Sequence, residues 1–336
     1  MQKKLFELLD AMQQKKILVL GDMVADVYLE GKIARISREA PVLVLEYSGE
    51  KVVPGGAANV VLNAAVLGGL VRAVGVIGRD DTGRELARCL QERKVNTDGL
   101  ITDDIRPTTT KTRIMAGAKA TVRQQVVRID REDRTPLSTH AESTVLTAVK
   151  TAIDQIGAVV MSDYGGSAIS PSLLRQVIDL CKEKNIPCIV DSRYNILAYK
   201  GATVIKQNES EIAAALGYDT LNESNLLAAG RQLLELMEAQ AIMLTRGPEG
   251  MSIFEHGGKV THIPVVDVSE VFDVTGAGDT AVAAMALALA AGANYVEAAQ
   301  LANFAAGVVV TKFGAATVSP AELKEVIGSY YENSNG

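Results

Sequence analysis

Short apolar segments alternate with longer segments of helical spacing along most of the chain. A short apolar run that ends at a glycine or a polar residue is typical of a buried strand. Such runs occupy residues 16–20, 42–47, 72–77, 158–161, 187–190, 203–205 and 241–244. Apolar residues at every third or fourth position predict helices. These occupy residues 1–16, 55–67, 80–93, 138–155, 171–184, 209–216 and 280–291. Repeated strand–helix units predict an α/β fold with a largely parallel sheet and helices on both faces.

The pattern changes in two stretches, at about residues 26–50 and 106–130. Residues 108–116 and 122–129 alternate apolar and polar positions, as half-exposed antiparallel strands do. Residues 117–119 are suited to the turn between them. We therefore expect the two stretches to form a small β-rich lid. Its exposed strands would leave unpaired edges, so we also expect a homodimer through the lid.

Composition and charge narrow the class of protein. The chain has 336 residues, 48% of them hydrophobic, and a net charge of −6. We expect one domain over residues 1–336. The mild acidity argues against a nucleic-acid-binding or membrane-surface protein. The N-terminus lacks a signal-peptide core, and the apolar run at residues 281–291 is too short for the ~20 residues of a membrane span. Three unpaired cysteines and three scattered histidines indicate a cytoplasmic protein without a metal cluster.

The segment Asp-Val-Thr-Gly-Ala-Gly-Asp at residues 273–279 is the strongest candidate for chemistry. At the start of a helix, the amides of Gly276, Ala277 and Gly278 can face an anion such as a transferring phosphoryl group. Asp279 beside them is placed to take a proton from an attacking hydroxyl. Two other interpretations stay open: a plain helix cap, and a dinucleotide site, because the glycines loosely fit GxGxxA. The chain has no GxxxxGK[ST] motif, which excludes a Walker-type kinase.

Two signatures together resemble a known family. Residues 273–279 resemble the C-terminal signature of the ribokinase (PfkB) family of carbohydrate kinases. Residues 54–59, Pro-Gly-Gly-Ala-Ala-Asn, followed by Asn63, resemble its N-terminal glycine signature. The resemblance extends over nearly the whole chain. It implies a ribokinase-like fold and an enzyme that transfers a phosphoryl group from ATP, with Mg²⁺, to a sugar hydroxyl.

The resemblance also implies roles for the other candidate site residues. The sugar-binding candidates are Asp22, Asp26, Gly55, Gly56, Asn59 and Asp163. The nucleotide-binding candidates are Asn208, Glu211, Thr245, Gly247, Gly250, Asn303 and Gly307. Glu211 ends an NxxE motif and is expected to hold Mg²⁺ through a water. Asp273 and Thr275 lie where some relatives place a monovalent cation. From the residues alone, turn capping by the carboxylates and helix packing by the glycines stay open as alternatives.

The predicted lid is rich in basic residues, which would suit a substrate that already has a phosphate. These residues are Arg35, Arg38, Lys111, Arg113, Arg123 and Arg128. The segments at residues 34–42, 110–113, 124–130 and 162–165 resemble the heptose-7-phosphate kinases of ADP-heptose synthesis. The resemblance implies phosphorylation of O1 of D-glycero-D-manno-heptose 7-phosphate, with the distal phosphate held by Lys111 and Arg113.

Some positions depart from that branch. Residues 166–168 stand where a lysine is expected, Gln207 replaces a proline, and Asp-Ser-Arg at residues 191–193 replaces Asp-Pro-Lys. Many relatives also have a nucleotidyl-transferring domain for which this sequence has no room, so we expect a separate enzyme for that step. The departures leave open a kinase for another sugar phosphate, such as fructose 1-phosphate or tagatose 6-phosphate. They do not change the prediction of a kinase. Independently of them, two alternatives from other classes stay open: a non-catalytic sugar or nucleotide sensor and, more distantly, a nicotinamide-dependent oxidoreductase.

Overall fold

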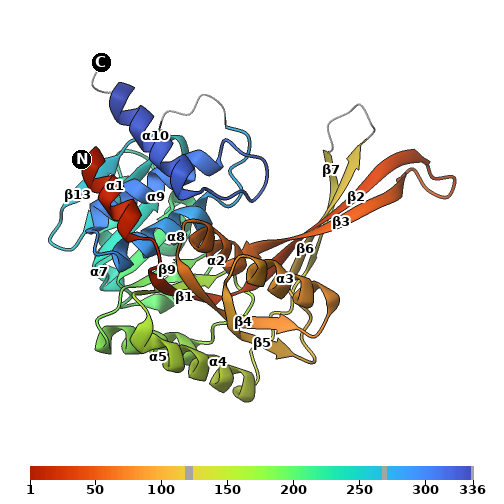
Figure 1. Cartoon of the computed structure of the whole chain (residues 1–336), viewed down its shortest axis with the longest axis horizontal. Helices are drawn as coiled ribbons and strands as arrows, with labels where there is room; N and C mark the ends of the chain where they lie inside the picture. The colour runs from red at the N-terminus through yellow and green to blue at the C-terminus, as the bar shows by residue number, and fades with distance from the viewer. Residues whose placement is uncertain (118–123, 267–270, 334–336) are drawn as a thin grey trace.

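The computed structural model describes residues 1–117, 124–266 and 271–333. Within these residues, nine strands form the main sheet in the order β13-β12-β11-β10-β9-β8-β1-β4-β5 (Figure 1). The strands from β11 to β5 are parallel, whereas β12 and β13 pair antiparallel. The bounds are β1 Lys16–Gly21, β4 Leu70–Gly78, β5 Asn96–Asp103, β8 Ala158–Asp163, β9 Cys188–Ser192, β10 Val204–Asn208, β11 Ala241–Thr245, β12 Met251–Glu255 and β13 Val260–Ile263.

Helices cover both faces of this sheet. Successive side chains of a strand point to opposite faces, and in the central strands both sets are apolar and must be covered. In β1, Ile17 and Val19 belong to one buried cluster, and Leu18 and Leu20 belong to the other. The first face packs against α1 Gln2–Ala11, α2 Ala57–Val66, α3 Asp81–Glu92, α8 Ala277–Ala290, α9 Tyr295–Val309 and α10 Pro320–Asn333. The second packs against α4 Thr139–Ala152, α5 Pro171–Glu183, α6 Glu209–Leu216 and α7 Leu226–Met237. The predicted α/β architecture is confirmed.

Three of the elements that the sequence pattern misses lie at the edges of the main sheet. β5 forms one edge, and β12 and β13 form the other. An edge strand is only half covered, so its apolar signal is weak. In β5, for example, Leu100 and Ile101 are the only large apolar residues. α7 and α10 were also not predicted. Of the helices described, none is long and apolar enough to cross a lipid bilayer.

A second sheet, which we call the lid sheet, projects from the body of the molecule (Figure 1). Four strands of the described chain form it in the order β3-β2-β6-β7. They are β2 Met23–Ile36, β3 Leu43–Gly56, β6 Thr110–Gly117 and β7 Gln124–Arg131. β2 was not predicted as a strand, and β3 continues beyond the predicted 42–47 to Gly56. Residues 118 and 119 of the predicted turn lie outside the described residues.

The base of the lid sheet adjoins the end of β1. The chain passes from β1 through Asp22 directly into β2. β3 ends at Gly56, where α2 begins, and Gly56 has a φ of 53°. Asp26 on β2 lies in register with Lys111 on β6. The predicted sugar-binding residues are therefore placed where the two sheets meet.

Candidate active site

The parallel strands β8 to β11 end at one edge of the main sheet, beside a cavity of about 880 Å³. Open α/β sheets bind ligands at this edge. The lining includes predicted residues Asp163, Asn208, Glu211, Thr245, Gly247, Gly250, Ala277, Gly278, Asn303 and Gly307. The other predicted residues lie outside this lining: Asp22, Asp26, Gly55, Gly56, Asn59, Lys111, Arg113, Gly276 and Asp279. The contacts described below connect most of them to it.

The glycine turn forms the start of α8. Gly276 has a φ of 82°, which favours glycine, and a Cβ there would lie 2.7 Å from Asn59 Nδ2. The Ala277 amide donates to the Val274 carbonyl at 3.3 Å. The amides of Gly276 and Gly278 donate to no acceptor within the part of the chain that the structure describes. Two of the three predicted amides are thus left for an anion.

Asp279 lies in the first turn of α8 and is only 5% exposed. Its Oδ2 accepts a hydrogen bond from Asn59 Nδ2 at 2.7 Å, and its Oδ1 accepts one from Tyr164 Oη at 2.8 Å. Burial raises the pKa of Asp279 to about 6, although the bonds from Asn59 and Tyr164 lower it. A carboxylate with a pKa near neutrality, held by two donors, has the properties of a general base.

A buried amide network supports Asn59 from behind. Asn63 Nδ2 donates to Asn59 Oδ1 at 3.1 Å and to the Asn59 carbonyl at 2.9 Å. The Thr280 hydroxyl donates to Asn63 Oδ1 at 2.9 Å. This chain of bonds joins α2 to α8. It fixes the Asn59 amide so that the NH₂ group of Asn59 faces Asp279. The sequence analysis had predicted that Asn59 contacts the sugar, not that it orients Asp279.

Lys206 and Asp191 form a buried ion pair that the sequence analysis missed. Lys206 Nζ lies 2.9 Å from Asp191 Oδ2, and both side chains are less than 10% exposed. Burial lowers the pKa of Lys206, but the carboxylates of Asp191 and Glu211 outweigh it and raise the pKa. A Cβ on Gly278 would lie 3.0 Å from this ammonium, so a positive charge adjoins the glycine turn. A lysine inside the apolar strand β10 was the available signal.

Asp22 is placed differently from a free sugar ligand. Its Oδ2 accepts the amides of Tyr164 at 2.7 Å and Gly166 at 2.9 Å. Its Oδ1 accepts the amide of Ala168 at 3.1 Å. Burial raises the pKa of Asp22 despite these bonds. The carboxylate therefore holds the loop after β8, and its predicted contact with the sugar stays a prediction.

The two predicted lid cations have different partners. Arg113 Nη1 donates to Asp26 Oδ1 at 2.6 Å, and its guanidinium lies 5.4 Å from the centre of the Tyr28 ring. Lys111 Nζ lies 5.3 Å from the centre of the Tyr164 ring. Of the two, only Arg113 pairs with a carboxylate of the described chain. The predicted contacts of Lys111 and Arg113 with a substrate phosphate stay a prediction.

The remaining predicted lid cations lie farther out. Arg128 pairs with Asp130 on β7. Arg35 and Arg38 are both exposed, at and just beyond the far end of β2. Arg123 lies outside the described residues.

The geometry agrees with the family comparison. The chain matches the model for pfkB family carbohydrate kinases over residues 14–322. The chain belongs to this family. Residues 14–322 therefore form a carbohydrate kinase domain, of a family that transfers a phosphoryl group to a sugar hydroxyl.

Two pfkB relatives share about two fifths of their aligned residues with this kinase. It is 41% identical over 312 residues to the bifunctional protein HldE of Geobacter sulfurreducens, which covers 93% of this chain and 62% of that protein. It is 40% identical over 321 residues to the bifunctional protein HldE of Azorhizobium caulinodans, which covers 94% of this chain and 65% of that protein. The chain thus spans less than two thirds of the length of these curated relatives.

Solved structures show the same fold at low identity. The Arabidopsis thaliana ribokinase complexed with ribose and ATP aligns with a TM-score of 0.70 at 19% identity, covering 94% of this chain and 99% of that one. Phosphofructokinase-2 from Escherichia coli in complex with substrates and products aligns with a TM-score of 0.75 at 19% identity, with the same coverage. The pfkB kinase described here therefore has the ribokinase-like fold.

At the end of the cavity where the predicted nucleotide-binding residues lie, polar groups precede an apolar recess. Asn208 and Glu211 form a capping box at the start of α6, in which Glu211 Oε2 accepts the Asn208 amide at 2.8 Å. Asn303 Nδ2 donates to the Pro264 carbonyl at 2.8 Å. The apolar side chains of this wall are Val265, Val271, Val274, Ala306 and Val310. A charged end and an apolar end suit the phosphates and the base of a nucleotide.

The divalent metal that ribokinase-like kinases use with ATP has few protein ligands to draw on here. No group of three or more His, Cys, Asp or Glu side chains is placed to bind a metal, among the described residues. Burial raises the pKa of Glu211, while the nearby Lys206 lowers it. With Oε2 occupied by the Asn208 amide, the other oxygen of Glu211 is left for a metal-bound water. This fits Mg²⁺, which retains several waters and takes phosphate oxygens as ligands.

Asp273, predicted near a monovalent cation, stabilises the approach to the glycine turn. Its Oδ1 accepts the Thr275 amide at 2.9 Å, and its Oδ2 accepts the Gly314 amide at 3.1 Å. Burial raises the pKa of Asp273, but these bonds outweigh it and lower the pKa. Both carboxylate oxygens thus have protein donors, and a cation there stays a prediction.

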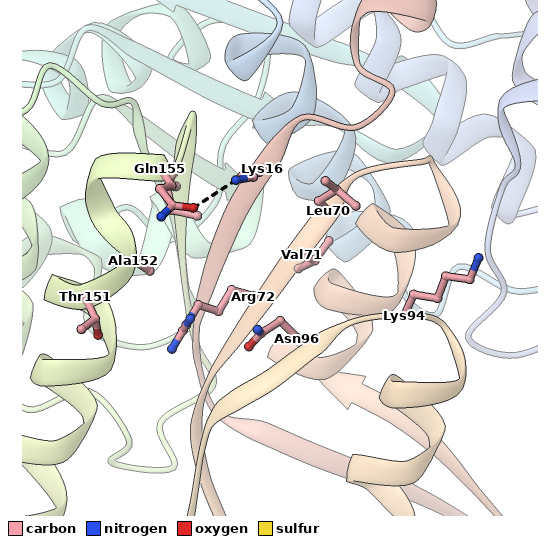
Figure 2. Close-up of a pocket in the computed structure, with 10 residues that line it drawn as sticks. Lys16, Leu70, Val71, Arg72, Lys94, Asn96, Thr151, Ala152 and Gln155 are labelled. Carbon is pink, nitrogen blue, oxygen red and sulfur yellow. Dashed lines mark hydrogen bonds between the residues drawn. The ribbon is translucent and has the colours of Figure 1, made fainter.

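A second hollow, of about 280 Å³, lies at the opposite edge of the main sheet. Figure 2 shows Lys16, Leu70 and Asn96, the first residues of β1, β4 and β5, around it. Lys16 Nζ donates to Gln155 Oε1 at 3.0 Å across its rim (Figure 2). The Arg72 guanidinium points into it beside the C-terminal end of α4, whose carbonyls favour a cation. Because parallel strands start at this edge, the hollow is separate from the site at their ends.

Proposed function

We propose that this sugar kinase phosphorylates O1 of D-glycero-D-manno-heptose 7-phosphate, with ATP as the phosphoryl donor. The observation that supports it most is the buried Asp279 carboxylate beside the free amides of the glycine turn. The similarity of the lid and loop segments to heptose-7-phosphate kinases supports the choice of sugar, as does the 41% identity to a protein named HldE.

In this proposal, Asp279 takes the proton from the O1 hydroxyl as O1 attacks the terminal phosphorus of ATP. The new bond joins O1 to that phosphorus, the bond from phosphorus to the ADP oxygen breaks, and ADP leaves. The amides of Gly276 and Gly278 donate to the equatorial oxygens of the migrating group, and the Lys206 ammonium adds positive charge there. Preorganised donors of this kind typically account for 10²–10³ in rate apiece.

A bound Mg²⁺ would neutralise charge on the phosphates of ATP. We place it next to Glu211, through a water, on the free oxygen described above. Asn208 caps the helix and holds Glu211 at 2.8 Å, and its predicted contact with the nucleotide stays a prediction. A monovalent cation beside Asp273 and Thr275 would stabilise the same turn.

The distal phosphate of the sugar would lie against Lys111. This ammonium adjoins Tyr164, which contacts Asp279, so one sugar phosphate can span the two groups. Arg113 already pairs with Asp26 and would contribute by fixing that carboxylate for the sugar hydroxyls. Gly55 allows this, because a Cβ there would lie 2.7 Å from Asp26 Oδ2.

We also propose that two copies pair through the lid sheet. Its outer part exposes large apolar side chains that a monomer would leave in water: Ile33, Ile36, Leu43, Tyr47, Val127 and Ile129. Every residue of β7 is exposed in the single chain. Exposed apolar strands of this kind are usually covered by a partner. Light scattering should give twice the mass of the chain, and Val127→Glu should reduce it to the monomer; a monomeric wild type would refute the pairing.

A substrate panel with coupled ADP detection tests the proposed activity. The panel contains heptose 7-phosphate, fructose 1-phosphate, tagatose 6-phosphate and the unphosphorylated heptose, and ³¹P NMR locates the new phosphate. We expect the highest kcat/KM for heptose 7-phosphate and a product phosphorylated at O1. Preference for a hexose phosphate would refute the choice of sugar. ATP binding without turnover of any sugar would favour a sensor.

A further inference from the structure

The loop after β8 forms a tight cradle for a carboxylate. Gly165 and Ser167 have φ values of 79° and 64°, so the chain reverses twice within a few residues. This turns the amides of Tyr164, Gly166 and Ala168 toward Asp22, at 2.7 to 3.1 Å. Successive amides in such a turn form an anion-binding concavity. Here the anion is a side chain of the protein itself, at the junction of β1 and β2.

Close packing leaves this loop little freedom. A Cβ on Gly166 would lie 2.7 Å from Asp22 Oδ1, so only glycine fits while the carboxylate is in place. The Arg106 guanidinium donates to the Gly166 carbonyl at 3.1 Å from the other side. The position where a lysine was expected from the family resemblance is thus occupied by a tightly held turn.

Tyr164 links this cradle to the base. Its backbone amide donates to Asp22, and its side-chain hydroxyl donates to Asp279 Oδ1 at 2.8 Å. Asn59 holds the other oxygen of Asp279 at 2.7 Å. Two donors from different elements therefore determine the orientation of a buried carboxylate, and one of them depends on a loop that Asp22 anchors.

We propose that Tyr164 is a positioning residue for Asp279 and that Asp22 acts through Tyr164 by anchoring its loop. The inference rests on the proposed role of Asp279 as the base. It assigns Asp22 a task different from binding the sugar. A hydroxyl that donates to the carboxylate also favours its charged form, so loss of the hydroxyl should make Asp279 harder to ionise.

Among the described residues, few charged groups act on Asp279. The change in its ionisation on loss of the Tyr164 hydroxyl is therefore measurable. Asp191 on β9 raises the pKa of Asp279, and Lys206 on β10 lowers it. Lys111 on β6 faces the far side of the Tyr164 ring at 5.3 Å. Tyr164→Phe leaves all three in place and removes one hydroxyl.

Steady-state kinetics against pH test the proposal. Tyr164→Phe should lower kcat by about 10- to 100-fold, since small errors in the position of a base are costly, with little change in the KM for ATP. The acid limb of kcat/KM should move up by about one pH unit, as expected for a lost bond to a charged group. Tyr218→Phe is the matched control, because its hydroxyl donates to Gln232 at 3.2 Å outside the site. An unchanged limb in Tyr164→Phe would overturn the proposal.

A double-mutant cycle tests the part of Asp22. Asp22→Asn places an NH₂ group against amide donors, so the loop should shift and reproduce the loss seen in Tyr164→Phe. In the Tyr164→Phe background, Asp22→Asn should change the limb little further, because its effect passes through the missing hydroxyl. Gly166→Ala displaces the same loop and replaces Asp22→Asn if that variant does not fold. Fully additive losses would show that Asp22 acts elsewhere.

A measurement without turnover separates this inference from the proposed function. The ¹³C chemical shift of the Asp279 carboxyl, assigned with Asp279→Asn, follows its titration directly. The titration midpoint should rise in Tyr164→Phe and stay unchanged in Tyr218→Phe. Failure of the wild type on every sugar phosphate would refute the proposed function and leave this test intact. Conversely, an unchanged midpoint in Tyr164→Phe would refute the positioning role of Tyr164 even if the wild type is fully active.

Discussion

Lys206 Nζ lies 2.9 Å from Asp191 Oδ2 in a pair that is almost entirely buried, directly under the glycine turn at Gly278. The two residues are in register on the neighbouring strands β9 and β10. Each partner makes the burial of the other tolerable, since an isolated charge in the interior is costly. The Lys206 ammonium is thus kept charged next to the turn where the negatively charged oxygens of a phosphoryl group would bind.

Lys206→Met should lower both turnover and stability. The variant leaves Asp191 as an uncompensated buried charge, which typically costs roughly 3–5 kcal/mol of folding free energy. Loss of the positive charge at the turn should lower kcat by roughly 10²–10³-fold. The double variant Lys206→Met/Asp191→Leu should recover most of the stability in urea unfolding without recovering turnover. Recovery of turnover in the double variant would show that Lys206 is only structural.

The pH dependence of stability should reveal Asp279. Its pKa of about 6 lies above its ordinary value of 3.8. Between these values the folded state binds more protons than the unfolded state, so this group's contribution to stability falls as pH rises through about 6. The full difference corresponds to roughly 3 kcal/mol. Asp279→Asn removes it, so the variant should be more stable relative to the wild type at pH 8 than at pH 4 in urea unfolding. An equal difference at both values would contradict the raised pKa.

Turnover should depend on the same ionisation of Asp279, but it should increase with pH where the contribution of Asp279 to stability decreases. The base acts only when charged, so log kcat/KM for the wild type should rise with unit slope below pH 6 and level off above it. Asp279→Asn should retain ATP binding by calorimetry while turnover falls by roughly 10²–10⁴-fold. Near-normal turnover in this variant would refute the base assignment.

Gly276 should tolerate no side chain. Gly276→Ala adds a Cβ about 2.7 Å from Asn59 Nδ2, at a φ of 82°. It should displace Asn59 from Asp279 and abolish most turnover. Gly292→Ala is the matched control, because Gly292 has a φ of 90° and no neighbour within 4 Å of the added Cβ. Both should lose roughly 1–2 kcal/mol through backbone strain, but only Gly276→Ala should lose activity. Equal loss of activity in both would mean that the strain alone matters.

Lys111 should discriminate between phosphorylated and unphosphorylated sugars. Lys111→Ala should raise the KM for the sugar phosphate by about tenfold or more, with little effect on the KM for ATP, because a charge-assisted bond is lost. Lys32→Ala, an exposed lysine on β2, is the matched control and should leave both KM values unchanged. A uniform loss with phosphorylated and unphosphorylated sugars would place Lys111 outside the phosphate site.

The sequence alone determined the elements whose signal is local. Apolar runs and helical spacing located β1, β4, β8 and most central helices to within a few residues. The glycine pattern at residues 273–279 marked the start of α8, because a left-handed backbone at Gly276 is a local requirement. Edge strands such as β5 and β13 escaped, since half-covered strands need few apolar residues.

Only the tertiary structure decided which side chains meet at Asp279. Asn59, Tyr164 and Lys206 come from α2, the loop after β8, and β10, and the parallel sheet brings their ends together. Nothing local indicates that Asp22 would be surrounded by three amides, or that Arg113 would pair with Asp26 and leave Lys111 free. Residue type and spacing predict which groups are chemically able to act as a base, an anion-binding donor or a phosphate-binding cation. Packing across distant elements decides which of them are held, neutralised or left for a substrate.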